Sequence, residues 1–245
     1  MKLKYCGLKT ESALNLCATL KIDYVGFILY PPSSRFISFE DLEKLLEKTS
    51  KNSYKSSYKT VMVSVNHPIE KLISWAVKLK IDVLQLHGDE DEKYLSAICK
   101  NLEKNKTDSI KIFKVLRLKK ETKKKEITKI FKTFSDYTHT FLIEPHHKDY
   151  GGAGQSLDQN NIYNALEIAN QLDKKIILSG GITKDDIDKI KKLSDQYQSL
   201  FAIDVNSSLE REKGLKDLNK MREFYNYFQK TFNSNTPIEN DAAIS

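Results

Sequence analysis

The sequence predicts one α/β domain, a closed (β/α)8 barrel of the TIM-barrel type. Short β-branched and apolar runs alternate with amphipathic helical stretches along the chain, which indicates a parallel sheet. Eight such units fit into 245 residues, a length typical of a single closed barrel. Most of the nine glycines directly follow strand segments, where the chain must turn sharply. An open, doubly wound sheet is the alternative, and the number of units favours the barrel over it.

Eight segments have the length and residue types of buried strands. They are Leu3–Cys6, Tyr24–Leu29, Val61–Val65, Val83–Leu86, Lys111–Leu116, Thr140–Ile143, Lys175–Ser179 and Phe201–Val205. Eight stretches between and after them carry apolar residues three and four positions apart, the spacing of an amphipathic helix. They are Glu11–Leu20, Phe39–Lys48, Ile69–Leu79, Asp91–Leu102, Glu121–Phe134, Ile162–Asn170, Lys184–Leu193 and Asp217–Phe228.

Two polar segments lie outside this repeat. Residues 231–245 lose all periodicity, so we expect the barrel domain to span residues 1–230 and this tail to be disordered. The Ser- and Lys-rich segment Lys48–Thr60 reads as an extended loop between a helix and the next strand, on the face away from the predicted site.

Composition excludes several classes of protein. The mean hydropathy is −0.50 and no apolar run approaches the length of a membrane span. The first residues turn directly into strand-like sequence without the features of a signal peptide, so we expect a cytoplasmic protein. Its three cysteines, Cys6, Cys17 and Cys99, show no metal-binding spacing, and we expect reduced thiols and no metal.

The net charge of +7 permits an anionic partner. The longest lysine runs alternate with glutamates, as on a solvated helix face, and no nucleic-acid-binding motif accompanies them. We therefore expect a small-molecule substrate and neither nucleic acid nor membrane as a partner. The chain is expected to be a monomer or a homodimer.

Two predicted loops have the composition of a phosphate site. Strand 7 ends in Ser179-Gly180-Gly181, and strand 8 ends in Asp204-Val205-Asn206-Ser207-Ser208. In many barrels the loops after strands 7 and 8 bind phosphate through backbone N–H groups. Ordinary turn chemistry would also explain either loop alone. Their occurrence together predicts that Gly180, Gly181 and residues 206–208 hold a phosphate.

The first strand carries a cysteine at its carboxyl end. Alternation places Leu3 and Tyr5 toward the helices, and Lys4 and Cys6 toward the barrel interior. Cys6 then lies at the mouth where barrel active sites form, and its thiolate could act as a base or nucleophile. On spacing alone, a small buried apolar side chain is the favoured interpretation.

Four further residues are candidates for the site. Gln85 and His87 share the inward face of strand 4, where His87 has either a binding and acid–base role or a structural one. Glu144 closes the apolar strand 6, a position suited to a general acid or to a simple loop carboxylate. Arg35 is a candidate clamp for a carboxylate, although a lone arginine is more often a surface charge. Residues 150–154, rich in glycine, are expected to form a mobile loop able to close over the substrate.

Taken together, these segments resemble the phosphoribosylanthranilate isomerase family over about residues 2–228. The resemblance rests on an ordered set of motifs, each weak alone. They are Cys6-Gly7-Leu8, Gly26-Phe27, Pro32-Ser33-Ser34-Arg35-Phe36-Ile37-Ser38, Val65-Asn66, Gln85-Leu86-His87-Gly88, Gly151-Gly152-Ala153-Gly154-Gln155-Ser156-Leu157-Asp158, Ser179-Gly180-Gly181-Ile182, Asp204-Val205 and Gly214-Leu215-Lys216-Asp217.

The resemblance implies an Amadori rearrangement in tryptophan biosynthesis, without metal or organic cofactor. N-(5-phosphoribosyl)anthranilate would become 1-(2-carboxyphenylamino)-1-deoxyribulose 5-phosphate. By position, Cys6 matches the family's general base, Glu144 its general acid and Arg35 the residue that holds the anthranilate carboxylate. The resemblance also implies substrate contacts for Gln85, His87 and Asp204.

The chain departs from the family pattern at two places. Glu144 stands where the family usually has aspartate, and Asn206-Ser207-Ser208 replaces its usual Ser-Ser-Gly. An extra methylene moves the carboxyl group, and a misplacement near 1 Å can cost about a hundredfold in rate. The alternatives are a related barrel enzyme of histidine or indole metabolism, or a divergent barrel that binds a phosphorylated ligand without efficient catalysis. The strand-1 cysteine and residues 85–88 argue against the first, and the joint presence of Cys6, Arg35 and His87 argues against the second.

Overall fold

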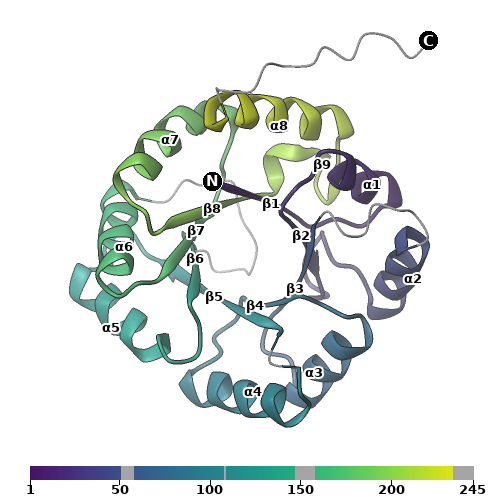
Figure 1. Cartoon of the computed structure of the whole chain (residues 1–245), viewed down its shortest axis with the longest axis horizontal. Helices are drawn as coiled ribbons and strands as arrows, with labels where there is room; N and C mark the ends of the chain where they lie inside the picture. Colours follow the sequence, from purple (N-terminus) through teal and green to yellow (C-terminus); the bar gives the residue numbers. More distant parts are fainter. Residues whose placement is uncertain (51–57, 108, 147–157, 234–245) are drawn as a thin grey trace.

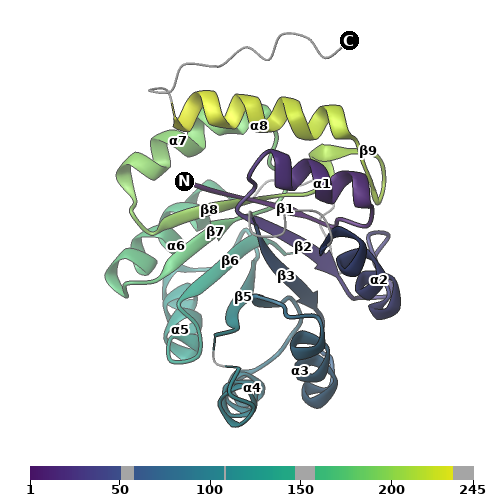
Figure 2. The same ribbon diagram turned by 45° about the vertical axis from the view of Figure 1, so that its right-hand side comes forward.

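The computed structural model describes residues 1–50, 58–107, 109–146 and 158–233. Eight parallel strands form a closed barrel in the order β1 to β8, and the helices surround it as an outer ring (Figure 1). The predicted single-domain TIM barrel is thereby confirmed. In the view turned by 45°, the strands run inclined within the ring of helices (Figure 2). None of the described helices is long and apolar enough to cross a membrane.

The strands are β1 (Lys2–Cys6), β2 (Tyr24–Ile28), β3 (Lys59–Ser64), β4 (Val83–Leu86), β5 (Lys111–Leu118), β6 (Thr140–Pro145), β7 (Lys175–Leu178) and β8 (Leu200–Val205). The helices are α1 (Glu11–Thr19), α2 (Phe39–Ser50), α3 (Ile69–Lys78), α4 (Glu92–Lys104), α5 (Lys124–Phe134), α6 (Gln159–Gln171), α7 (Ile187–Gln196) and α8 (Leu218–Phe232). All eight predicted strands and all eight predicted helices are present, with shifts of a few residues at their ends.

The alternation of each strand separates two apolar cores. Outward side chains such as Leu3 and Tyr5 belong to the large core between the barrel and the helices. Inward side chains, among them Val61, Val63 and Ala202, form a smaller core inside the barrel that includes Cys6. The prediction that Leu3 and Tyr5 face the helices and Cys6 faces the barrel interior is thus confirmed. The polar side chains of the site lie at the carboxyl ends of the strands, next to this inner core.

Several helix boundaries differ from the prediction because local polar groups define them. Asp91 and Asp217, predicted as first helical residues, are N-caps whose carboxylates accept hydrogen bonds from backbone N–H groups of α4 and α8. The predicted helix from Lys184 begins instead as a 3₁₀ turn, η1 (Lys184–Asp186), capped by Thr183, and continues as α7. A turn from Lys119 to Thr122 delays the start of α5.

Two parts of the chain were not anticipated. A 3₁₀ turn, η2 (Ser207–Leu209), leads into a short antiparallel hairpin of β9 (Glu210–Glu212) and β10 (Leu215–Lys216) between β8 and α8. Helix α8 extends to Phe232, four residues beyond the predicted end, where the rings of Phe228 and Phe232 pack 4.7 Å apart. Within the predicted loop 48–60, α2 reaches Ser50 and β3 begins at Lys59. The predicted tail 231–245 therefore starts too early, because residues 231 and 232 belong to α8. Residues 51–57 and residues 234–245 of that tail lie outside the described residues.

Candidate active site

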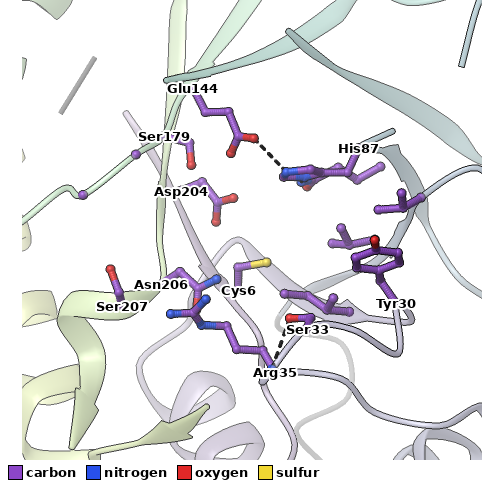
Figure 3. A pocket seen from close by; sticks show the side chains of 16 residues that line it. Cys6, Tyr30, Ser33, Arg35, His87, Glu144, Ser179, Asp204, Asn206 and Ser207 are labelled. Atoms are coloured by element: carbon purple, nitrogen blue, oxygen red, sulfur yellow. Dashed lines mark hydrogen bonds and ion pairs between the residues drawn. The ribbon is translucent and has the colours of Figure 1, made fainter. Parts of the chain in front are cut away.

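A pocket lies at the carboxyl ends of the barrel strands, the face where barrel enzymes form their active sites (Figure 3). Its lining comes from strands and loops far apart in sequence. The residues are Cys6, Ile28, Tyr30, Ser33, Arg35, Val63, Val65, Gln85, His87, Glu144, Ser179, Gly180, Gly181, Asp204, Asn206 and Ser207. Every predicted site residue except Ser208 therefore lines one pocket.

Cys6 lies at the floor of this pocket with 3% of its surface exposed. The neighbouring strand makes room for its sulfur with a glycine, because a Cβ atom at Gly26 would lie 2.8 Å from Sγ of Cys6 and 3.1 Å from Nζ of Lys4. Burial raises the pKa of the Cys6 thiol, and the nearby Lys4 ammonium opposes this increase. The thiol is thus buried and also lines the pocket. Both interpretations of its spacing, a small buried side chain and a group at the mouth of the barrel, therefore describe part of its environment.

Beneath Cys6, a buried ion pair crosses from β1 to β8. Nζ of Lys4 donates a hydrogen bond of 2.8 Å to Oδ2 of Asp204. Burial disfavours the Lys4 ammonium, but Asp204 and Cys6 outweigh that effect and raise its pKa above the ordinary value. The other carboxylate oxygen, Oδ1, is buried with no hydrogen-bond partner among the described residues. This free acceptor at the pocket is available to a substrate hydroxyl.

His87 connects Gln85 to Glu144. Nδ1 of His87 lies 3.2 Å from Nε2 of Gln85, and Nε2 of His87 lies 2.8 Å from Oε1 of Glu144. Figure 3 shows His87 and Glu144 facing each other on the side of the pocket opposite Arg35. Each ring nitrogen of the imidazole therefore faces one polar side chain, Nδ1 the Gln85 amide and Nε2 the Glu144 carboxyl group. His87 is thus placed at the predicted acid, which favours a role in the site over a purely structural one.

Arg35 is held in a buried position by a carboxylate that the sequence analysis did not single out. Its Nε and Nη2 donate to the two oxygens of Glu210 at 2.6 and 3.0 Å, a bidentate pair, and only 5% of Arg35 is exposed. The interpretation of Arg35 as a surface charge is therefore wrong. Nη1 makes no hydrogen bond to the described residues and remains available for a ligand.

Lys216 connects this pair to the strand-8 loop. Its ammonium donates to the side-chain and backbone oxygens of Asn206 at 2.6 and 2.7 Å and to Glu210 at 3.1 Å. Burial opposes ionisation of Glu210, but the hydrogen bonds and charges of Arg35 and Lys216 outweigh it and lower the pKa of that carboxyl. The hairpin β9–β10 thus supplies both a counter-ion for Arg35 and an anchor for Asn206.

The two predicted phosphate loops lie side by side at one edge of the pocket. Gly180 and Gly181 have φ angles of 98° and 65°, which favour glycine and turn the chain after β7. Within the described part of the chain, their backbone N–H groups have no acceptor. Ser207 lines the pocket, whereas the hydroxyl of Ser208 donates to the carbonyl of Ile182 at 2.7 Å and links the two loops. Residues 150–154 of the predicted mobile loop lie outside the described residues.

The fold and the site define a class of protein, an α/β-barrel enzyme that combines acid–base side chains with anion-binding groups at one mouth. The family model of N-(5'-phosphoribosyl)anthranilate (PRA) isomerase matches residues 3–227. The isomerase of that name from Caldanaerobacter subterraneus subsp. tengcongensis is 35% identical over 226 residues, covering 91% of this chain and 96% of that protein. The chain belongs to this family, and its activity is that of a PRA isomerase in tryptophan biosynthesis.

Solved structures show the same fold at low identity. A phosphoribosyl anthranilate isomerase in complex with reduced 1-(o-carboxyphenylamino)-1-deoxyribulose 5-phosphate matches with a TM-score of 0.71 and 21% identity, over 94% of this chain and 98% of that one. A structure described as monomers of the dimeric isomerase from Thermotoga maritima gives a TM-score of 0.70 at 21% identity, over 96% and 99% of the two chains. Dimeric relatives of this chain therefore exist.

Proposed function

We propose that Glu144 is the general acid and Cys6 the general base of the Amadori rearrangement. The single observation that carries this proposal is that both side chains line one pocket from β6 and β1, with anion-binding groups on its rim. An acid and a base that act on different atoms of one substrate need such separate positions. The first two proton transfers of the proposal each use one of these two side chains.

In the first step, Glu144 gives its proton to the ring oxygen of the phosphoribosyl group. The C1–O bond breaks, the nitrogen lone pair forms a C1=N bond, and the open-chain Schiff base results. In the second step, the Cys6 thiolate removes the proton from C2, and the electron pair moves through C1 to the nitrogen. The resulting enolamine then tautomerises to the ketone: the C2 hydroxyl loses its proton as the C2=O bond forms, and the C1=C2 electron pair takes up a proton at C1. The proton that Cys6 has gained balances the one that Glu144 has given, so the whole sequence neither consumes nor releases a proton.

The charged ends of the substrate have matching groups in the pocket. We assign the anthranilate carboxylate to Arg35, whose Nη1 is available while Glu210 holds the other edge of the guanidinium. We assign the phosphate to the N–H groups of Gly180, Gly181 and the loop of Asn206, Ser207 and Ser208. Oδ1 of Asp204 and Oε1 of Gln85, both buried without a partner among the described residues, are assigned to the sugar hydroxyls.

The contact between His87 and Glu144 supports a fixed position for the longer carboxylic side chain. A glutamate reaches farther from β6 than the aspartate usual in the family, and the imidazole meets it at 2.8 Å. The extra methylene of glutamate adds a rotatable bond, and the hydrogen bond to His87 restricts the rotational freedom that this bond brings. We propose that His87 keeps Glu144 aimed at the ring oxygen.

We further propose a cytoplasmic enzyme that is a monomer or a homodimer. Cys6, Cys17 and Cys99 are free thiols in the structure, as in a reducing compartment. A dimeric relative of the same fold supports the second of the two states.

The test is a fluorescence assay of the purified protein with freshly generated phosphoribosylanthranilate, following loss of the anthranilate signal. We expect turnover by the wild-type chain, and a loss of about 10²–10⁴ in kcat for Glu144→Ala and for Cys6→Ala. Cys99→Ala, which alters a thiol outside the pocket, is the matched control and should retain wild-type turnover. Near-normal turnover in either pocket variant would remove that residue from its assigned role.

A further inference from the structure

Outside the pocket, a further buried ion pair joins β5 to the loop that follows β4. Nζ of Lys114 lies 2.8 Å from Oε2 of Glu90, and their side chains are 4% and 1% exposed. Lys114 stands on the outward face of β5, in line with Ile112 and Leu116, which belong to the apolar core between barrel and helices. Desolvating two charges here costs free energy, so stability alone does not account for the pair.

Both members of the pair form hydrogen bonds to the backbone of Gly88. Oε1 of Glu90 accepts a hydrogen bond of 3.1 Å from the backbone N–H of Gly88, and Nζ of Lys114 donates one of 3.1 Å to the carbonyl of the same Gly88. The N–H group of Gly88 is thus held by the Glu90 carboxylate and its carbonyl by the Lys114 ammonium. Gly88 is the residue directly after His87, whose imidazole contacts the proposed acid.

The adjacent loop after β3 is held by the same carboxylate. Oε1 of Glu90 also accepts from the backbone N–H of Asn66 at 2.9 Å, and Oδ1 of Asn66 accepts from the N–H of Asp89 at 2.9 Å. Asn66 has a φ of 51° and packs so closely that a Cβ at Gly88 would lie 2.3 Å from its Oδ1. The backbone on the C-terminal side of His87 therefore has no freedom to shift without breaking this network.

On this geometry, and resting on the acid role proposed for Glu144, we propose that Glu90 and Lys114 are positioning residues for His87. By clamping Gly88, they set the direction of the imidazole and so maintain the 2.8 Å contact that aims Glu144. Neither side chain lines the pocket, so both act through the backbone of residues 87 and 88 rather than on the substrate.

The decisive variant is the double substitution Glu90→Gln/Lys114→Met. The glutamine retains an Oε1 acceptor for the N–H groups of Asn66 and Gly88, the methionine preserves most of the lysine stem, and both buried charges are removed together. We expect a folded protein, because replacing both partners of a buried pair is often neutral for stability. We expect kcat to fall about 10- to 100-fold, with KM changed less than about threefold.

Two further readouts separate positioning from a general structural defect. The pH limb of kcat that reports the general acid should move, and the ring ¹⁵N and ¹H resonances of His87, assigned with His87→Asn, should shift. The matched control is Lys124→Met/Glu167→Gln, which removes an exposed pair of the same residue types between α5 and α6. It should leave all three readouts at wild-type values.

The proposal would be overturned if the Glu90→Gln/Lys114→Met protein folds and keeps the wild-type kcat, pH limb and His87 resonances. It would also be overturned if the control variant changes these readouts equally. If the double variant does not fold, Glu90→Gln alone serves, since it keeps the N–H acceptor and removes one charge; the same outcomes apply. Failure of the acid assignment is distinguishable: Glu144→Gln would then retain activity, while the His87 resonances would still report whether the clamp positions the ring.

Discussion

Lys4 and Asp204 form a fully buried ion pair directly beneath Cys6, with Nζ and Oδ2 2.8 Å apart. Burial raises the pKa of the Cys6 thiol, and the Lys4 ammonium is the charge that most strongly opposes that effect. Asp204 balances that charge and presents its second oxygen to the pocket. In our proposal, this one pair acts on both the base and the substrate.

We predict that Cys6→Ser retains the fold and loses most of the activity. A serine hydroxyl has nearly the same size as the thiol but ionises far above the working range, so it cannot replace a thiolate base. We expect kcat to fall by about 10²–10⁴, the usual contribution of a general base. Wild-type melting temperature combined with that loss, measured by circular dichroism and the fluorescence assay, would support the role. Comparable turnover in Cys6→Ser would contradict it.

We predict that Gly26→Ala disables the site although it replaces none of the proposed catalytic residues. The new methyl group would lie 2.8 Å from the Cys6 sulfur, closer than packed atoms allow, so the thiol must move. Overpacking of this kind costs about 1–3 kcal/mol in stability, and a displaced base should lower kcat about a hundredfold. Chemical denaturation and steady-state kinetics measure the two effects. A variant with unchanged kcat would mean that the sulfur position is not critical.

We predict that Glu144→Asp remains active and that Glu144→Gln does not. The aspartate keeps an ionisable carboxyl but ends one methylene farther from His87, so the 2.8 Å contact should be lost. We expect a loss of about 10-fold for the shorter acid and about 10²–10⁴ for the amide. Equal loss in both variants would mean that reach, and not proton donation, is the property that matters.

We predict that Glu210→Gln raises KM more than it lowers kcat. The amide keeps one acceptor for Arg35 but removes the charge that balances Arg35 and Lys216, so the guanidinium becomes less well directed. A tenfold rise in KM would correspond to about 1.4 kcal/mol of lost substrate binding. Glu212→Gln, an exposed neighbour on the same hairpin, is the control and should bind substrate normally. A kcat loss with unchanged KM would assign Glu210 a different role.

The sequence analysis identified the barrel and the inward side chains because both follow from local periodicity. Alternation with period two places Cys6 and Gln85 inside the barrel, and the structure has them there. The order of strands around the barrel then brings residues of β1, β4, β6 and β8 to one mouth. The resemblance to the family motifs indicated which of these inward residues are candidates for the site.

The partners of these side chains could not be predicted, because their pairing depends on tertiary distance. Arg35 and Glu210 are 175 positions apart, and Glu210 lies in a hairpin too short for any periodic signal. Glu90 and Lys114 are 24 positions apart on different elements. Only Lys114 offered a weak signal for a buried partner, because it is a charged residue that shares the outward, apolar face of its strand with Ile112 and Leu116.

A last prediction concerns stability at alkaline pH. Cys17 in α1 is fully buried, and burial raises the pKa of its thiol far above the ordinary value of 9.0. Above pH 9 the unfolded chain therefore loses a proton that the folded chain keeps. Because the folded state then binds more protons, the free energy of unfolding falls as pH rises, by up to about 1.4 kcal/mol per pH unit for this group.

Cys17→Ala isolates that contribution. At pH 7 the variant should be less stable than wild type by about 1 kcal/mol, because a small buried group is lost. Between pH 9 and about pH 10.5, that deficit should shrink by about 1.4 kcal/mol per pH unit and then change sign, because alanine has no proton to lose. Urea denaturation at each pH gives both curves. The control is Leu14→Val in the same helix, which has no titrating group, and its free energy of unfolding should run parallel to that of wild type across this pH range. A parallel curve for Cys17→Ala would show instead that the thiol ionises in the folded state as readily as in the unfolded chain.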